Sequence, residues 1–230
     1  MANPDILKFP AGVGERKGCK SPVGRASFPK LLQPDAKFGK PKFSVGLIFD
    51  PSDPAYQALK VELLKAHAEA VEYCRTHAPK SYDTEGKQKP LLVADPPFGV
   101  QLNRDKVPTG KMVVKFKANA EYTDKTKVVH KKDLPLYTGQ AKPWPRSVEI
   151  GGGSRIRVYY DVVPFYTAQA GAGISLRMSA VTILEACTYG PKIDAEDDYV
   201  APDVDVTPEG VAAEAPAGDV GSAPTAAGSF

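Results

Sequence analysis

The chain has 230 residues, of which 42% are hydrophobic, so it can bury the core of one domain or of two small ones. It has no run of about 18 apolar residues, which excludes a transmembrane helix, and residues 1–20 lack the apolar stretch of a secretory signal. Three widely separated cysteines make no disulfide framework, and three scattered histidines lack metal-site spacing. We therefore expect a protein of the reducing cytoplasm.

The net charge of +3 conceals two segments of opposite charge. Residues 1–190 contain 29 Lys and Arg against 18 Asp and Glu, a balance of +11. Residues 191–230 contain one Lys against nine acidic residues, a balance of −8. The basic body should attract polyanions, and the acidic segment is itself a polyanion on the same chain. Its low hydrophobicity and negative charge predict a disordered tail.

In chain order, the polar residues 1–20 are predicted to be flexible, and residues 21–29 form a short strand between prolines. Residues 42–50 alternate between apolar and polar side chains, which is typical of a half-buried strand. An Asp-Pro pair at residues 53–54 supplies a helix N-cap and a proline in the first turn. Apolar residues at helical spacing then predict an amphipathic helix over residues 54–77, with an inner stripe of Tyr56, Leu59, Leu63, Ala66, Ala70 and Cys74.

Residues 111–122 predict a second strong strand, with apolar side chains at even positions and cations at odd ones. A long polar loop over residues 124–145 follows and carries the only tryptophan, Trp144. Residues 155–165 and 173–185 then predict an antiparallel hairpin.

The stretch from residue 154 to residue 160 alternates strictly. The pattern predicts one face for the core and one for solvent or a ligand: Ile156, Val158 and Tyr160 against Arg155, Arg157 and Tyr159. Taken alone, this stretch is best explained as an ordinary surface strand. A slip of one residue would exchange Tyr159 and Tyr160 between the two faces.

Cations recur on the polar faces of three predicted strands, and each of these strands is apolar on its other face. If the strands are neighbours, one groove collects Lys111, Lys115, Lys117, Arg155, Arg157, Tyr159 and Arg177. Phosphates would contact the cations and bases would stack on the aromatic ring. A single strand fits better than a duplex, because no basic recognition helix is predicted.

Trp144 has two equally good interpretations. It lies on a cationic loop beside Lys142 and Arg146, where it could stack on a base. It could equally anchor that loop to the core.

Catalytic motifs are absent from the sequence. Gly151 to Gly153 lacks the Lys-Ser/Thr of a phosphate-binding loop and precedes a strand, and no Gly-x-Ser-x-Gly occurs. Asp95, Asp105 and Asp161 could bind Mg²⁺, but no spacing singles them out. We expect no enzyme, cofactor or metal. Two alternatives stay open, a virion structural or assembly protein and a metal-dependent nuclease that uses these aspartates.

Four segments together resemble a family of tailed-phage single-stranded DNA-binding proteins, once described as a domain of unknown function: residues 21–29, 39–45, 154–160 and 172–181. The resemblance covers about residues 20–190. It implies a mainly β OB-fold over residues 21–190, a five-stranded antiparallel barrel with one inserted helix. It also implies an acidic tail over residues 191–230 that ends in an aromatic residue.

The resemblance further implies binding of single-stranded DNA, without strong sequence preference, in phage replication, recombination or repair in the cytoplasm of an infected bacterium. The tail of such proteins is taken to occupy the groove when DNA is absent and to recruit the replication polymerase and helicase. The tail residues concerned would be Asp194, Glu196, Asp197, Asp198, Asp203, Asp205 and Phe230. The sequence is compatible with more than one oligomeric state, including a homodimer.

Overall fold

The structure is a computed structural model that describes residues 7–37, 39–79, 87–103 and 105–188. The predicted acidic tail, residues 191–230, lies outside the described residues. The helix is α1 (Pro54–His77). The strands are β1 (Arg16–Lys20), β2 (Gly24–Asp35), β3 (Lys42–Phe49), β4 (Phe98–Leu102), β5 (Pro108–Asn119), β6 (Glu121–Thr123), β7 (Val129–Lys131), β8 (Leu136–Thr138), β9 (Arg155–Thr167) and β10 (Gly171–Glu185).

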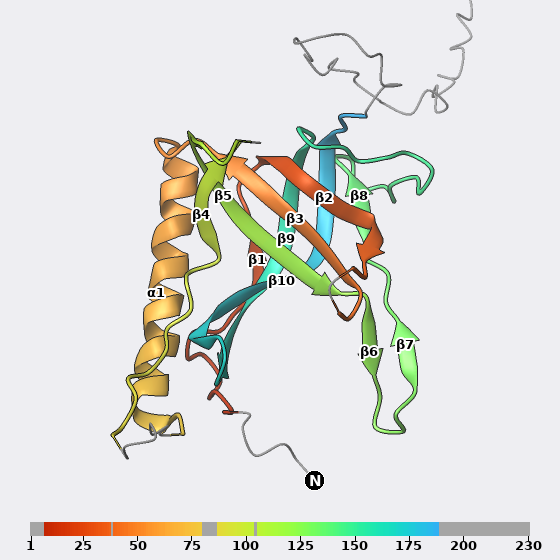
Figure 1. Cartoon of the computed structure of the whole chain (residues 1–230). Helices are drawn as coiled ribbons and strands as arrows, with labels where there is room; N and C mark the ends of the chain where they lie inside the picture. Colours follow the sequence, from red (N-terminus) through yellow and green to blue (C-terminus); the bar gives the residue numbers. More distant parts are fainter. Residues whose placement is uncertain (1–6, 38, 80–86, 104, 189–230) are drawn as a thin grey trace, which may run out of the picture.

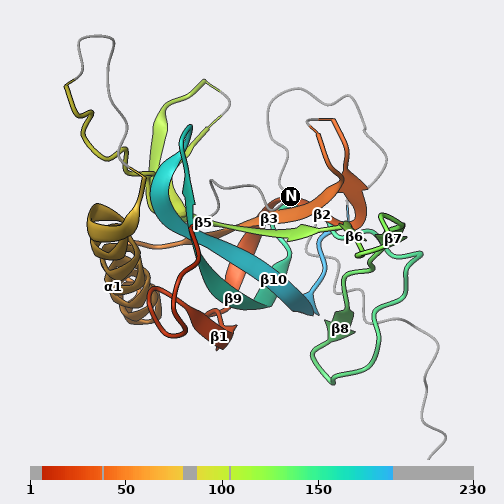
Figure 2. The same cartoon turned by 90° about the horizontal axis from the view of Figure 1, so that it is seen from below.

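Five of the described strands close into a ring (Figures 1 and 2). β2 pairs with β3, β3 with β5, β9 with β10 and β9 with β2, all antiparallel. A parallel contact between β5 and β10 completes the ring. This is the connectivity of an OB-type fold, so the predicted mainly β, OB-like fold with one helix is confirmed, while the parallel contact of β5 with β10 departs from the predicted all-antiparallel pairing. β1, β4 and β8 extend the sheet from β9, β5 and β10.

Alternation along β3, β5 and β9 fills the barrel interior. Each strand sends every second side chain inward, and these are the buried ones: Phe43, Val45, Leu47 and Phe49, then Val114, Phe116 and Ala118, then Ile156, Val158, Tyr160 and Val162. Tyr160 meets Phe116 edge-on, with ring centroids 5.1 Å apart. The predicted register, with Tyr160 inside and Tyr159 outside, is therefore confirmed. Burial raises the pKa of Tyr160.

α1 begins and ends where the sequence predicts. The Asp53 side chain accepts a hydrogen bond of 2.8 Å from the Ala55 amide, as an N-cap should. All six residues of the predicted inner stripe are buried, and α1 contacts β9 and β10. Within the described residues no helix has the length and apolar character needed to cross a membrane.

Several strand limits differ from the prediction. β2 continues past the expected end at residue 29, and β4 was not predicted at all. In β10 the pairing with β9 shifts between Met178 and Ala180. This β-bulge reverses the alternation, so that Val181 and Ile183 are buried, whereas unbroken alternation from Ile174 would have buried Thr182 and Leu184.

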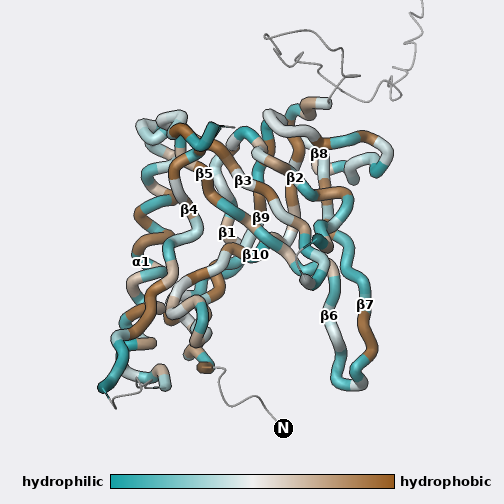
Figure 3. The backbone as a smooth tube through the Cα atoms, in the orientation of Figure 1, coloured by the Kyte–Doolittle hydropathy of each residue, from teal (hydrophilic) through white to brown (hydrophobic). Residues whose placement is uncertain are grey.

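The predicted loop over residues 124–145 contains strands instead. β6 and β7 form a two-stranded arm that projects from the barrel (Figure 1), and the hydropathy colouring marks a hydrophobic stretch at β7 (Figure 3). Asp124 closes its turn by accepting hydrogen bonds from Thr126 and Val128. Bonds from the Thr126 hydroxyl and from His130 help lower the pKa of Asp124 to about 2. β8 then runs parallel to β10.

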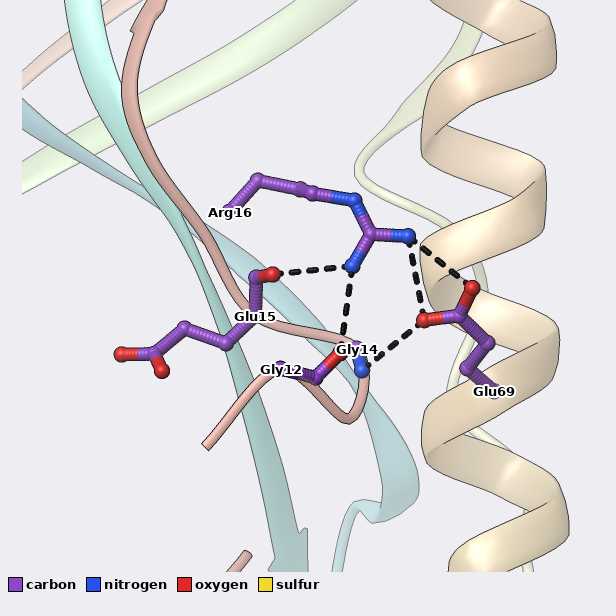
Figure 4. Close-up of polar contacts among 5 residues, drawn as sticks. All are labelled: Gly12, Gly14, Glu15, Arg16 and Glu69. Atoms are coloured by element: carbon purple, nitrogen blue, oxygen red, sulfur yellow. Dashed lines mark hydrogen bonds and ion pairs between the residues drawn. The ribbon is translucent and has the colours of Figure 1, made fainter. Parts of the chain in front are cut away.

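The segment predicted to be flexible, residues 1–20, contributes β1 and a polar anchor on α1 (Figure 4). The Arg16 Nη2 atom donates to Glu69 Oε1 at 2.9 Å and to Oε2 at 3.0 Å, and the Gly14 amide donates to Oε2 at 3.1 Å. The hydrogen bond from Arg16 is the main reason why the pKa of Glu69 is lowered. This anchor joins residues 14–16 to the helix.

The pKa of Glu69 predicts how this anchor responds to pH. A carboxyl whose folded pKa lies below its unfolded value of about 4.3 stabilises the fold above that value and loses this contribution as pH falls through the folded pKa. Glu69→Gln should therefore lower the free energy of unfolding at neutral pH, and the difference from the wild type should shrink in acid. Urea unfolding over a pH series measures both.

The matched control is Glu72→Gln on the same helix. Among the residues that the structure describes, Glu72 pairs only with the exposed Arg75, so its replacement should have little effect at any pH. A Glu69→Gln deficit that persists undiminished in acid would contradict the assigned role of the carboxylate.

Candidate nucleic-acid interface

A groove of about 530 Å³ crosses the outer face of β3 and β5. Its floor includes Ser44 and Gly46 of β3 and Val113, Lys115 and Lys117 of β5. Phe28 of β2 and the side chains of Val100 and Leu102 of β4 also line it. The groove therefore combines ammonium groups with apolar side chains.

The lysines of the groove are held outward by the core beneath them. Val114, Phe116 and Ala118 point into the barrel, so Lys115 and Lys117 must point out. Neither lysine forms an ion pair with any described residue. Lys117 also lies directly opposite Arg177 in the parallel ladder of β5 and β10. Like charges placed in this way repel each other, although Asp161 of β9, on the other side of Arg177, offsets part of this repulsion.

β9, which carries the other predicted cations, forms another wall of the ring (Figure 2). Arg155 is exposed and forms an ion pair with Glu185, and the Nε of Arg157 is buried without a hydrogen-bond partner. The ring of Tyr159 lies 5.8 Å from the Lys20 ammonium. The structure therefore places Lys115 and Lys117 in the groove, with Lys111 farther along β5 and Arg177 opposite Lys117, and it places the β9 residues outside the groove lining.

Register links the two groups across β2 and β3. Arg155 lies opposite Arg25, Arg25 opposite Ile48, and Ile48 opposite Val113 in the groove floor. Arg155 and Arg25 are exposed and Ile48 is half-buried. A chain that left the groove over Ile48 would reach these arginines next.

Trp144 belongs to the core, whereas Arg146 is exposed and bonds to the backbone. Trp144 is only 7% exposed, and its Nε1 donates to the Val148 carbonyl at 3.1 Å. Arg146 donates to the Leu134 carbonyl at 2.9 Å. Of the two interpretations of Trp144, the structure favours the core anchor, and a DNA contact by Arg146 stays a prediction.

The remaining candidates do not form a site in the part of the chain that the structure describes. Asp161 accepts a hydrogen bond from the Gly18 amide, and no group of three or more His, Cys, Asp or Glu there could hold a metal ion. The tail residues lie outside the described ranges: Asp194, Glu196, Asp197, Asp198, Asp203, Asp205 and Phe230.

Sequence reasoning missed Phe28. Simple alternation puts it on the face of Ala26, in the core, yet it is 88% exposed at the groove. The available signal was Pro29, because proline inside a strand pattern is confined to edges and bulges.

An OB-type barrel with a basic groove over the second and third strands of its ring places the chain in the class of oligonucleotide-binding barrels. A family described as "Single-stranded DNA-binding protein, Bacteriophage T7" matches residues 22–186. The chain belongs to this family, and the predicted resemblance is confirmed.

Individual relatives agree. The single-stranded DNA-binding protein of Escherichia phage T7 is 30% identical over 190 residues, which cover 79% of this chain and 78% of the relative. That of Enterobacteria phage T3 is 29% identical over 181 residues, 75% of each chain. The crystal structure of gp2.5, a single-stranded DNA-binding protein encoded by bacteriophage T7, matches with a TM-score of 0.60 and 27% identity, over 80% of this chain and 98% of gp2.5. These relatives are named as binding proteins, as expected for a chain that is no enzyme.

The buried position of Trp144 predicts its fluorescence. As the only tryptophan in the chain, it should emit at the short wavelengths of a buried indole, and oligo-dT should leave this emission unchanged. Emission spectra recorded during a titration with oligo-dT test this. Strong quenching that saturates with bound DNA would restore the stacking interpretation.

Proposed function

We propose that the protein binds single-stranded DNA in the groove over β3 and β5, largely independently of sequence. The observation that carries this proposal is the position of Lys115 and Lys117, neither of which forms an ion pair with a described residue, beside apolar groove walls. Membership of the family and the names of the relatives support the same ligand. The setting we propose is phage DNA replication, recombination or repair in the cytoplasm of an infected bacterium.

The chemistry of the groove favours an unpaired strand. The ammonium groups of Lys115 and Lys117 would contact phosphates, which carry no sequence information. Apolar side chains such as Val100 and Leu102 can pack against the flat faces of bases. In a duplex these faces are stacked on one another and are inaccessible. The groove therefore suits a strand whose bases are exposed.

The β9 cations would belong to a longer path of the same strand. A strand that crosses Ile48 reaches Arg25 and Arg155, with Arg157 and Tyr159 farther along β9. In this proposal the groove is the primary site and β9 holds the flanking nucleotides.

Charge reversal tests the groove. Lys115→Glu with Lys117→Glu should weaken binding to oligo-dT by orders of magnitude. It should also reduce the slope of log K against log salt by about 0.7 for each phosphate that no longer binds a lysine. Adding Arg157→Glu should weaken binding further if the strand reaches β9. Fluorescence anisotropy over a salt series measures all of these.

The control for this experiment is Lys60→Glu with Lys65→Glu on α1, which changes the net charge equally but lies outside the groove lining. If the control and the groove variant lose the same affinity while both stay folded, binding does not depend on the groove. An unaffected groove variant would place the site elsewhere.

We also propose that the acidic segment, residues 191–230, competes with DNA for the groove and recruits replication proteins such as a polymerase and a helicase. Its charge of −8 is tethered to a body of +11, so its local concentration at the groove is high. Lys115 and Lys117, neither of which forms an ion pair with a described residue, supply cations for a polyanion to bind there.

Deleting residues 191–230 should therefore tighten binding to oligo-dT at low salt, and the gain should fade as salt screens the competition. Parallel titrations of the full chain and the truncated chain measure the difference. Unchanged or weaker binding after truncation would rule out competition, while leaving groove binding itself intact.

A further inference from the structure

We propose that Phe28 is the base-stacking residue of the groove and that the fold holds it there in a strained backbone conformation. This inference rests on the proposed function and names the contact that a nucleobase makes. Tyr159, the aromatic candidate from the sequence, lies on β9 outside the groove lining. Phe28 lies in it.

A β-bulge turns Phe28 out of the core. Ser27 lies opposite Gly46 and Lys30 lies opposite Ser44, so β2 uses one residue more than β3 between the same two positions. The extra residue breaks the alternation between buried Ala26 and buried Leu31. Phe28 consequently leaves the inward face and stands at the groove.

The bulge leaves Phe28 with an unusual backbone and an uncovered side chain. The φ angle of Phe28 is 46°, a left-handed value that an aromatic side chain rarely adopts. At 88% exposure its ring is the most exposed large hydrophobic side chain among the described residues. Strain of this kind persists where a binding site requires it. An unusual backbone and an uncovered ring at one residue therefore both point to a ligand.

The surroundings indicate a flat ligand that carries negative charge. Gly46 keeps the floor low beside Phe28, and a Cβ at that position would lie only 2.8 Å from Val113 Cγ2. Val100 and Leu102 add half-exposed aliphatic side chains to the lining. Lys115 and Lys117 supply the cations in the same groove. A nucleobase with its phosphates matches this combination, whereas an apolar peptide side chain would leave the lysines without partners.

Stacking predicts a specific response to substitution. Phe28→Leu keeps an apolar side chain but removes the aromatic face, and it should weaken binding to oligo-dT about five- to hundred-fold. The slope of log K against log salt should stay unchanged, because the lysines still bind the same phosphates. Phe28→Trp should bind at least as tightly as the wild type. An oligonucleotide of equal length with abasic sites should bind equally well to the wild type and to Phe28→Leu.

A second variant separates binding from folding. Phe28→Gly relieves the left-handed backbone, so it should raise the midpoint of thermal unfolding while weakening DNA binding as Phe28→Leu does. A lower midpoint would show that Phe28 stabilises the fold and would overturn the proposal. Sedimentation of Phe28→Leu without DNA completes the set, since a change in oligomeric state would assign the ring to a contact between copies.

The two proposals fail differently. A wild-type protein that does not bind oligo-dT would refute the proposed function. A wild type that binds oligo-dT with the expected salt dependence, together with a Phe28→Leu variant that binds equally well, would refute only the assignment of Phe28.

Discussion

The barrel closes where β5 and β10 lie side by side in parallel, and the rest of the binding surface depends on this contact. Closure requires the inward side chains of both strands to meet in one core, with Phe116 on β5 and Leu176 and Met178 on β10 all buried. The outward residues at the contact are then Lys117 and Arg177. The interaction that completes the fold thus concentrates positive charge on its surface, and the apolar core holds that charge in place.

The separation of β5 into a buried apolar face and an exposed charged face follows from the same packing of the core. If the register of β5 shifted by one residue, Phe116 would turn to solvent and a lysine would turn into the core. Burying Phe116 is worth roughly 1.5–3 kcal/mol, far more than any exposed lysine contact gains. The core therefore sets the orientation of Lys115 and Lys117, and the groove inherits its pattern of charge from the packing beneath it.

Local patterns were sufficient to predict α1, β3, β5 and the β9–β10 hairpin, because long alternation or helical spacing reports burial directly. They failed where the chain departs from alternation: the bulge in β10 and the bulge at Phe28 each reverse the faces of a strand. β4 was not predicted from the sequence because the apolar side chains of Val100 and Leu102 line a groove instead of a core.

For a related reason, the sequence predicted the outward orientation of the site residues but not which of them lie together. Alternation revealed that Lys115, Lys117, Arg155, Arg157 and Arg177 point outward, but which strands are neighbours is a long-range property that no local pattern contains. Pairing placed Arg177 beside Lys117 and sent the β9 arginines to another wall. The sequence left both interpretations of Trp144 open, and only its packing showed that it belongs to the core.

The pairing of β2 with β9 has a consequence for how the molecule is made. Gly24 and Ile156 are partners although about 130 residues separate them, and β9 also pairs with β10 and β1. On the ribosome, the early strands emerge long before these partners exist. The ring can therefore form only late in synthesis, and such distant contacts make folding slow. Until then the apolar faces of β2, β3 and β5 have no complete barrel in which to be buried.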